Sequence, residues 1–198
     1  MQLPEPLDPD DKDQKIGAKY CDKLGKSRTI AELTKERLRR AGKKIKEDNP
    51  LFAGDLGFRV FKLDTSNIRA WQPNRDDLEQ TLLDHAEHIV AGRSEQDILY
   101  ELLLKLGLDL TVPIEQKTIA DKTVYSIGAG ALLVCLAEAI NRDAVEPLAQ
   151  GIISWHVELK PAVDTRLVFR DSAFADDVTK TNLTAILQQH GLDDVRSL

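Results

Sequence analysis

The chain has 198 residues and a mass of 22.1 kDa, which suffices for one core, or for the remnant of one domain joined to a smaller complete one. Apolar residues make up 42% of it and charged residues 30%, values that exclude wholesale disorder. The net charge of −6 excludes tight binding of duplex DNA by the chain as a whole, because non-specific affinity needs a wide basic surface.

The N-terminal region is expected to be a loop over residues 1–26, because prolines and a charged run interrupt it. Thr29 and Glu32 then form a capping box ahead of an apolar stripe, which predicts an amphipathic helix over about 30–47. The run FRVFKLD after Gly57 is apolar on both faces, which predicts an interior strand of a covered sheet.

Charge is distributed unevenly along the chain. Residues 26–46 hold nine Lys or Arg against two Glu, a net charge of +7, so the remainder carries −13. Cations repeated along a helix face can follow a phosphate backbone. The candidate nucleic-acid contacts are Arg37, Arg39, Arg40, Lys43 and Lys44. A solvated helix face, supported by the Glu36–Arg40 spacing of i,i+4, is the preferred interpretation, because no aromatic residue, Asn or Gln interleaves with these cations.

The turn-rich stretch WQPNRDD at 71–77 is interpreted as a linker, which places a domain boundary between residues 72 and 73. A helix that begins near Leu78 and stops at Gly92 is expected next. Ser94 caps a second helix, which ends at Gly107. The short turn between the two helices predicts an antiparallel hairpin.

The rest of the chain alternates strand and helix signals. Strands are expected over about 118–127 and 131–137, joined as a hairpin by Gly128-Ala129-Gly130. A helix over about 143–154, a strand over 165–170 and a helix over about 176–189 follow. The pattern predicts an α/β fold with a mixed sheet and flanking helices.

Polar residues follow two of the expected strands, where ligands bind in open α/β sheets. Asp64, Ser66 and Asn67 follow the first, and the run FRDSAFADDVTKTN follows the strand at 165–170. An Asp in that run could ligate Mg²⁺. Helix capping by Asp176 or Asp177, with an i,i+4 pair between Asp176 and Lys180, is the preferred interpretation.

No metal site is predicted. Asp84, His85 and His88 lie close together in the sequence, but spacing ties no third strong ligand to them. Glu158 and Lys160 match half of a metal-dependent nuclease motif and lack its Pro-Asp partner. No run of apolar residues is long enough for a membrane helix. The widely separated Cys21 and Cys135 indicate a reduced, cytoplasmic protein.

Several segments resemble one enzyme family. They are MQLPEP, TIAELTKERLRRAGKKIKED, GFRVFKLDTSN, ILYELLLKLGLDLT, KTVYSIGAGALLVC and VFRDSAFADDVTKTN. In this order they resemble adenine-N6 DNA methyltransferases, in particular the modification subunit of type III restriction-modification systems. The resemblance implies transfer of a methyl group from S-adenosylmethionine to adenine in DNA, on a base taken out of the helical stack. It also implies that 1–72 is a partial Rossmann-like stub and 73–198 an α/β assembly domain.

The resemblance implies roles for few residues of this chain. Gln2 matches the position that holds the ribose hydroxyls of S-adenosylmethionine. The 198 residues contain no D-P-P-Y tetrapeptide and no F-x-G-x-G loop, so no catalytic residue is assigned. We expect the chain alone to be inactive and to bind the cofactor weakly. The implied partners are DNA through the whole subunit, the restriction subunit and a second copy. The alternative is a free-standing, non-enzymatic interaction module.

Overall fold

The computed structural model describes residues 3–70, 76–77 and 88–198. The chain divides into two compact units, 1–61 and 62–198. The boundary expected from the sequence, between residues 72 and 73, lies at a turn-rich stretch whose residues 71–75 are outside the described ones.

The unit 62–198 contains a five-stranded mixed sheet in the order β1-β2-β3-β4-β5. The first three strands pair antiparallel, and β3, β4 and β5 run parallel to one another. This confirms the prediction of an α/β fold with a mixed sheet. The strands are β1 (Ile114–Ile119), β2 (Lys122–Ile127), β3 (Leu132–Cys135), β4 (Arg166–Phe169) and β5 (Asp194–Ser197).

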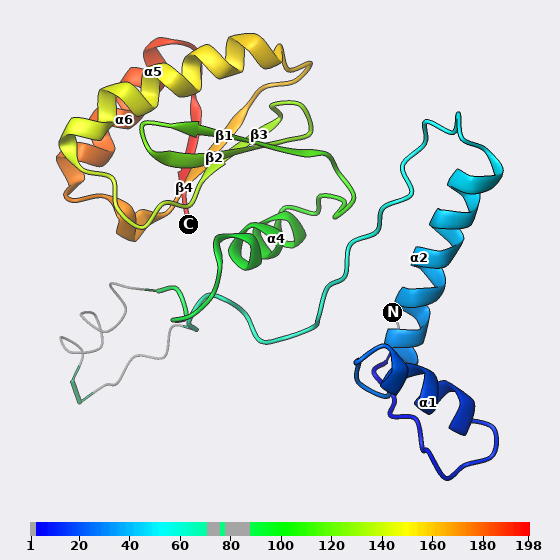
Figure 1. Cartoon of the computed structure of the whole chain (residues 1–198). Coiled ribbons are helices and arrows are strands. Elements are labelled where there is room, and N and C mark those ends of the chain that lie inside the picture. The colour runs from blue at the N-terminus through cyan, green and yellow to red at the C-terminus, as the bar shows by residue number, and fades with distance from the viewer. Residues whose placement is uncertain (1–2, 71–75, 78–87) are drawn as a thin grey trace. The chain divides into compact units, whose positions relative to one another are not determined.

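Helices cover both faces of this sheet, as Figure 1 shows. α5 (Arg142–Leu159) and α6 (Asp177–Gln189) pack on one face, and α4 (Glu95–Lys105) packs on the other. A short 3₁₀ helix, η1 (Asp171–Ala173), follows β4. Each long helix begins at a side-chain cap, which satisfies backbone N–H groups that the first turn leaves unpaired. The caps are Ser94, Asn141 and Asp176.

The prediction of a single strand over 118–127 is wrong. The chain turns back at Ala120-Asp121, and Ile119 pairs with Lys122 across this turn. Both turn residues have positive φ, 49° and 60°, the conformation of a two-residue type I′ hairpin turn. The turn contains no glycine, so its sequence did not indicate that the chain reverses here. The predicted β-hairpin around Gly128-Ala129-Gly130 is confirmed by the antiparallel pairing of β2 with β3.

The core is organised around β3, whose four residues are all buried. Leu133 and Cys135 face α5 and α6, and Leu132 and Val134 face the α4 side. Burial raises the pKa of the Cys135 thiol to about 11, so this thiol stays protonated at neutral pH. β5 was not predicted, because the segment DVRS is short and half charged.

The unit 1–61 has a much smaller core. Ala18 and Cys21 of α1 (Lys15–Lys23) are buried together with Leu7 of the preceding segment, and α2 (Ile30–Asp48) packs on them through Ile30 and Leu33. α2 confirms the predicted helix, whereas the prediction of a loop throughout 1–26 missed α1. Charged residues surround the two buried positions of α1 and obscure its apolar face.

The predicted interior strand at FRVFKLD is wrong. Residues 57–63 have no strand pairing, and Val60 and Leu63 are 53% and 90% exposed. A strand needs a neighbour for its backbone hydrogen bonds. The described residues of 1–61 contain no strand with which this run could pair. The Rossmann-like stub therefore stays a proposal. None of the described helices is both long enough and apolar enough to cross a membrane.

We predict that Gly151→Ala destabilises the protein. A Cβ at Gly151, on α5, would lie 2.2 Å from Cγ2 of Ile119, a contact that forces β1 and α5 apart. Overpacking of this kind costs about 1–3 kcal/mol, more than the gain of up to about 1 kcal/mol from removing a helical glycine. Chemical denaturation measures the change. Gln150→Ala, at the exposed neighbouring position, is the control and should shift stability little. Equal stability of Gly151→Ala and the wild type would contradict the packing.

We also predict that Glu101 contributes pH-dependent stability. Burial raises the pKa of Glu101, but hydrogen bonds from Ser66, Asn67 and Lys105 outweigh that effect and lower the pKa to about 2. A lowered folded-state pKa stabilises the fold above the unfolded-state pKa, and the contribution disappears as pH falls from about 4.5 towards 2. Glu101→Gln should cost about 1–3 kcal/mol at neutral pH and flatten the acid limb of the stability–pH curve. An unchanged acid limb would contradict this assignment.

Candidate functional site

Charged residues are most frequent on α2 among the described helices, where they make up 11 of 19 residues. Thr29 begins this helix, its Oγ1 accepting a hydrogen bond from the Glu32 N–H at 3.3 Å, and none of the residues of α2 is buried. All five predicted contact residues lie on it, in two groups. Arg37, Arg40 and Lys44, at i, i+3 and i+7, share one side of the helix, and Arg39 and Lys43, at i and i+4, share another.

Two of the arginines are held by neighbouring side chains. Arg40 Nε donates to Glu36 Oε1 at 2.9 Å, and its guanidinium lies 5.0 Å from the centre of the Tyr20 ring. Arg39 lies 3.8 Å from Glu36 Oε2 and 5.9 Å from the centre of the Phe58 ring. The hydrogen bond from Arg40 lowers the pKa of Glu36, which keeps this carboxylate charged between the two arginines.

The other three predicted contact residues have at most one exposed ion-pair partner among the described residues. Lys43 pairs with Glu47 at 3.6 Å on the exposed surface, where such pairs contribute little. Within the part of the chain that the structure describes, neither Arg37 nor Lys44 forms an ion pair. They are seven residues apart, about 10 Å along the helix axis. α2 contains no Asn or Gln, so it offers charge for phosphate groups and no amide for reading bases.

Sequence reasoning found these five residues and missed their aromatic neighbours. Tyr20 comes from α1, and Phe58 comes from the segment after α2. Both rings lie against arginines, a cation–π arrangement that fixes where a guanidinium points. No signal in the sequence of α2 reveals them. Gln2, the predicted contact for S-adenosylmethionine, lies outside the described residues.

Asp64, Ser66 and Asn67, considered as ligand-binding residues at the end of a strand, have structural roles instead. Asp64 pairs with Arg93 at 2.8 Å. Ser66 Oγ donates to Glu101 of α4 at 2.5 Å, and the Asn67 side-chain amide donates to the same carboxylate at 2.7 Å. These bonds tie the segment 64–67 to α4.

At the carboxyl end of β4 the polar residues also bond to one another. Asp176 caps α6, and its acceptance of hydrogen bonds from Thr179, with the help of Arg142 at 2.7 Å, lowers its pKa to about 2. The preferred capping interpretation is thus confirmed. The predicted pair of Asp176 with Lys180 is wrong, because Lys180 pairs with Asp171 and donates to Ser197.

Metal ligands do not gather in the described regions, where no group of three or more His, Cys, Asp or Glu is placed to hold an ion. Asp84 and His85 lie outside the described residues. Glu158 pairs with Lys117 at 2.8 Å, and Lys160 ends α5 in a left-handed conformation with φ 48°. Both residues of the nuclease-like motif thus have structural roles.

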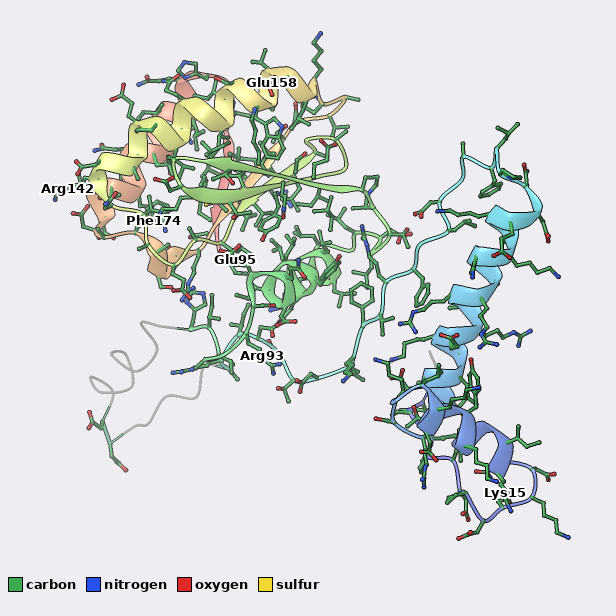
Figure 2. All side chains as sticks on the ribbon, in the orientation of Figure 1. Lys15, Arg93, Glu95, Arg142, Glu158 and Phe174 are labelled. Atoms are coloured by element: carbon green, nitrogen blue, oxygen red, sulfur yellow. The ribbon has the colours of Figure 1, made fainter. Side chains whose placement is uncertain are left out.

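A shallow hollow of about 390 Å³ lies near the ends of β3 and β4 in the unit 62–198. Its lining includes Arg69, Arg93 and Arg170 together with Glu138. Arg93 contacts Asp64 and Thr65, and Arg170 donates to Ser172. The side chains of Arg93 and Arg170 thus already bond to the protein, and Figure 2 shows Arg93 beside the segment that leads into α4.

Comparisons with known proteins identify no relative: no protein-family model matches the chain, and no curated protein has a significantly similar sequence.

Proposed function

We propose that this chain is the C-terminal portion of a site-specific adenine-N6 DNA methyltransferase of the type III restriction-modification kind. The support is the sequence resemblance of successive segments, from QLPEP near the N-terminus to VFRDSAFADDVTKTN, in the order of that family. In this proposal 1–72 completes the catalytic domain and 73–198 serves assembly. The proposed location is the cytoplasm, with which the free thiols of Cys21 and Cys135 are consistent.

Within this proposal the chain itself contributes contact with DNA, not catalysis. The observation that carries it is the exposed helix α2, which holds all five predicted contact residues; two of them, Arg37 and Lys44, have no ion-pair partner among the described residues. Neutralising phosphates with such cations releases counterions and favours binding without reading sequence. Contact is local, because the rest of the chain is acidic.

The chemistry of methyl transfer is assigned to residues outside this sequence. Transfer requires a donor site and an adenine clamp held together in one geometry, and the 198 residues contain neither the D-P-P-Y nor the F-x-G-x-G motif. S-adenosylmethionine would contact Gln2 in the whole subunit and bind weakly to this chain alone.

A second candidate function is a free-standing interaction module. One observation favours it: the sheet of the unit 62–198 is covered on both faces, so this unit buries its own core. The proposed partners are the restriction subunit and a second copy of the chain. Apolar side chains of the unit 1–61 offer contact area, since Leu38, Phe58 and Phe61 are 47%, 38% and 46% exposed. A reading frame encoding G-x-G and D-P-P-Y directly upstream would favour the first candidate, and its absence the second.

We predict that the isolated chain does not methylate DNA. Incubation with labelled S-adenosylmethionine and adenine-rich DNA should give the same incorporation as a control without protein, because neither active-site motif is present. Incorporation above that control would show that the assignment of the chemistry to other residues is wrong.

We further predict that α2 mediates weak, salt-dependent binding to DNA. Fluorescence anisotropy with a short duplex at low salt should show that Arg37→Glu/Lys44→Glu weakens binding by about tenfold or more and lowers the salt slope by roughly two. The matched control is Lys12→Glu/Lys19→Glu, which makes the same change of charge at exposed positions of the same unit. Equal effects of the two double variants would indicate net charge alone, and would contradict a contact by α2.

A further inference from the structure

The outer edge of β1 has backbone groups available for pairing. Ile119 pairs with Lys122 across the two-residue turn, and the Pro113 carbonyl accepts from the Gly128 N–H at 3.1 Å. In an antiparallel ladder alternate residues bond to the partner strand. Residues 115, 117 and 119 therefore bond to β2, and the N–H and C=O groups of Ile114, Gln116 and Thr118 point away from the sheet. Among the described residues no strand or isolated bridge pairs with that side.

This edge is long enough to accept another strand. β1 has six residues, no proline and no bulge in its pairing with β2, although native edges are usually protected by such features. Gln116 and Thr118 are exposed. The opposite edge, β5, has only four residues, and Asp194 on it is engaged by Arg166 and Arg196 at 2.7 Å each. β1 is thus the edge with room for a partner.

We propose that β1 pairs antiparallel with β1 of a second copy of this chain, across a two-fold axis at Gln116. Gln116 then lies opposite its own counterpart, and Ile114 lies opposite Thr118 of the second copy. All the outward N–H and C=O groups of Ile114, Gln116 and Thr118 find partners in this register, because each pair consists of two residues whose groups point outward. The two sheets become one continuous sheet, and neither β1 remains an edge.

Charge selects this register over its neighbours. With the axis at Gln116, Glu115 of each copy lies opposite Lys117 of the other, so two opposite-charge pairs form by symmetry. Moving the axis to residue 115 places Glu115 opposite Glu115, and moving it to residue 117 places Lys117 opposite Lys117. Both neighbouring registers oppose like charges and leave outward groups unpaired. The segment Glu115-Gln116-Lys117 is therefore self-complementary in one register.

Contacts within the chain hold the Lys117 side chain in place. Its Nζ lies 2.8 Å from Glu158 Oε2 and 5.8 Å from the centre of the Trp155 ring, both on α5. Figure 2 shows Glu158 near the end of α5. Lys117 is thus held on the face of the sheet that α5 covers. Glu115 shares that face, since residues two apart on a strand point the same way, and so would Glu115 of the second copy.

This inference uses only β1 and its register, so it stands or falls independently of the methyltransferase proposal. The test is the mass of the full chain by multi-angle light scattering across a dilution series. The expected mass at high concentration is twice 22.1 kDa. Glu115→Lys opposes two lysines at each end of the pairing and should raise the dimer dissociation constant by about tenfold or more. Adding Lys117→Glu to this variant exchanges the two charges and should restore most of the affinity.

A backbone variant and a matched control complete the experiment. Gln116→Pro removes an outward N–H and leaves the bonds to β2 intact, so the dimer should be lost while the thermal midpoint of the monomer changes little. Glu146→Lys makes the same change of charge at an exposed position of α5 and should leave the dimer unchanged.

Two results would overturn the proposal. One is a monomer at every concentration of the wild-type chain, which would mean that Glu115 and Lys117 protect the edge instead of pairing it. The other is a dimer that survives both Glu115→Lys and Gln116→Pro, which would place the contact on another surface. Recovery in the charge-exchanged variant, together with loss in the two single variants, supports the register centred on Gln116.

Discussion

The burial of β3 on both faces is the constraint on which the unit 62–198 depends. Each of its four residues is buried, two against α5 and α6 and two on the side of α4. A strand covered on both faces is expected to be apolar throughout, and the sequence of β3, LLVC, is. β4 repeats the pattern, because Leu167 and Phe169 face one way and Val168 the other. Helices on both faces follow from this requirement, since either apolar face would otherwise meet water.

The sequence predicts best those elements whose signals lie within their own residues. α4 and α6 combine a capping residue with an apolar stripe, and both are found where Ser94 and Asp176 indicated. The hairpin at Ala120-Asp121 escaped prediction because its turn has no glycine, although Asp tolerates positive φ. The run FRVFKLD led to the opposite error, a predicted strand that the structure does not contain. Its composition suits a strand, but the unit 1–61 provides no described strand beside it.

In the candidate site, too, local features could be predicted from the sequence and contacts between distant segments could not. Charge on α2 is a local property, so the five cations could be found from sequence alone. Their aromatic neighbours Tyr20 and Phe58 come from other segments, and contacts of that kind depend on how helices and loops pack. The role of Asn67 likewise depends on Glu101, 34 positions further along the chain. Ser66 and Asn67, which the sequence suggested as ligand-binding residues, instead donate hydrogen bonds to the partly buried carboxylate of Glu101.

Hydrogen exchange of the full chain, resolved by residue, tests the central claim most directly, namely that the two-sided burial of β3 holds the unit 62–198 together. Amides of β3 and β4 should exchange slowest, and only through global unfolding, because opening them exposes both halves of the core. Amides of α2, which has no buried residue, should exchange through local opening at a lower free energy. Exchange of β3 as fast as that of α2 would contradict the account.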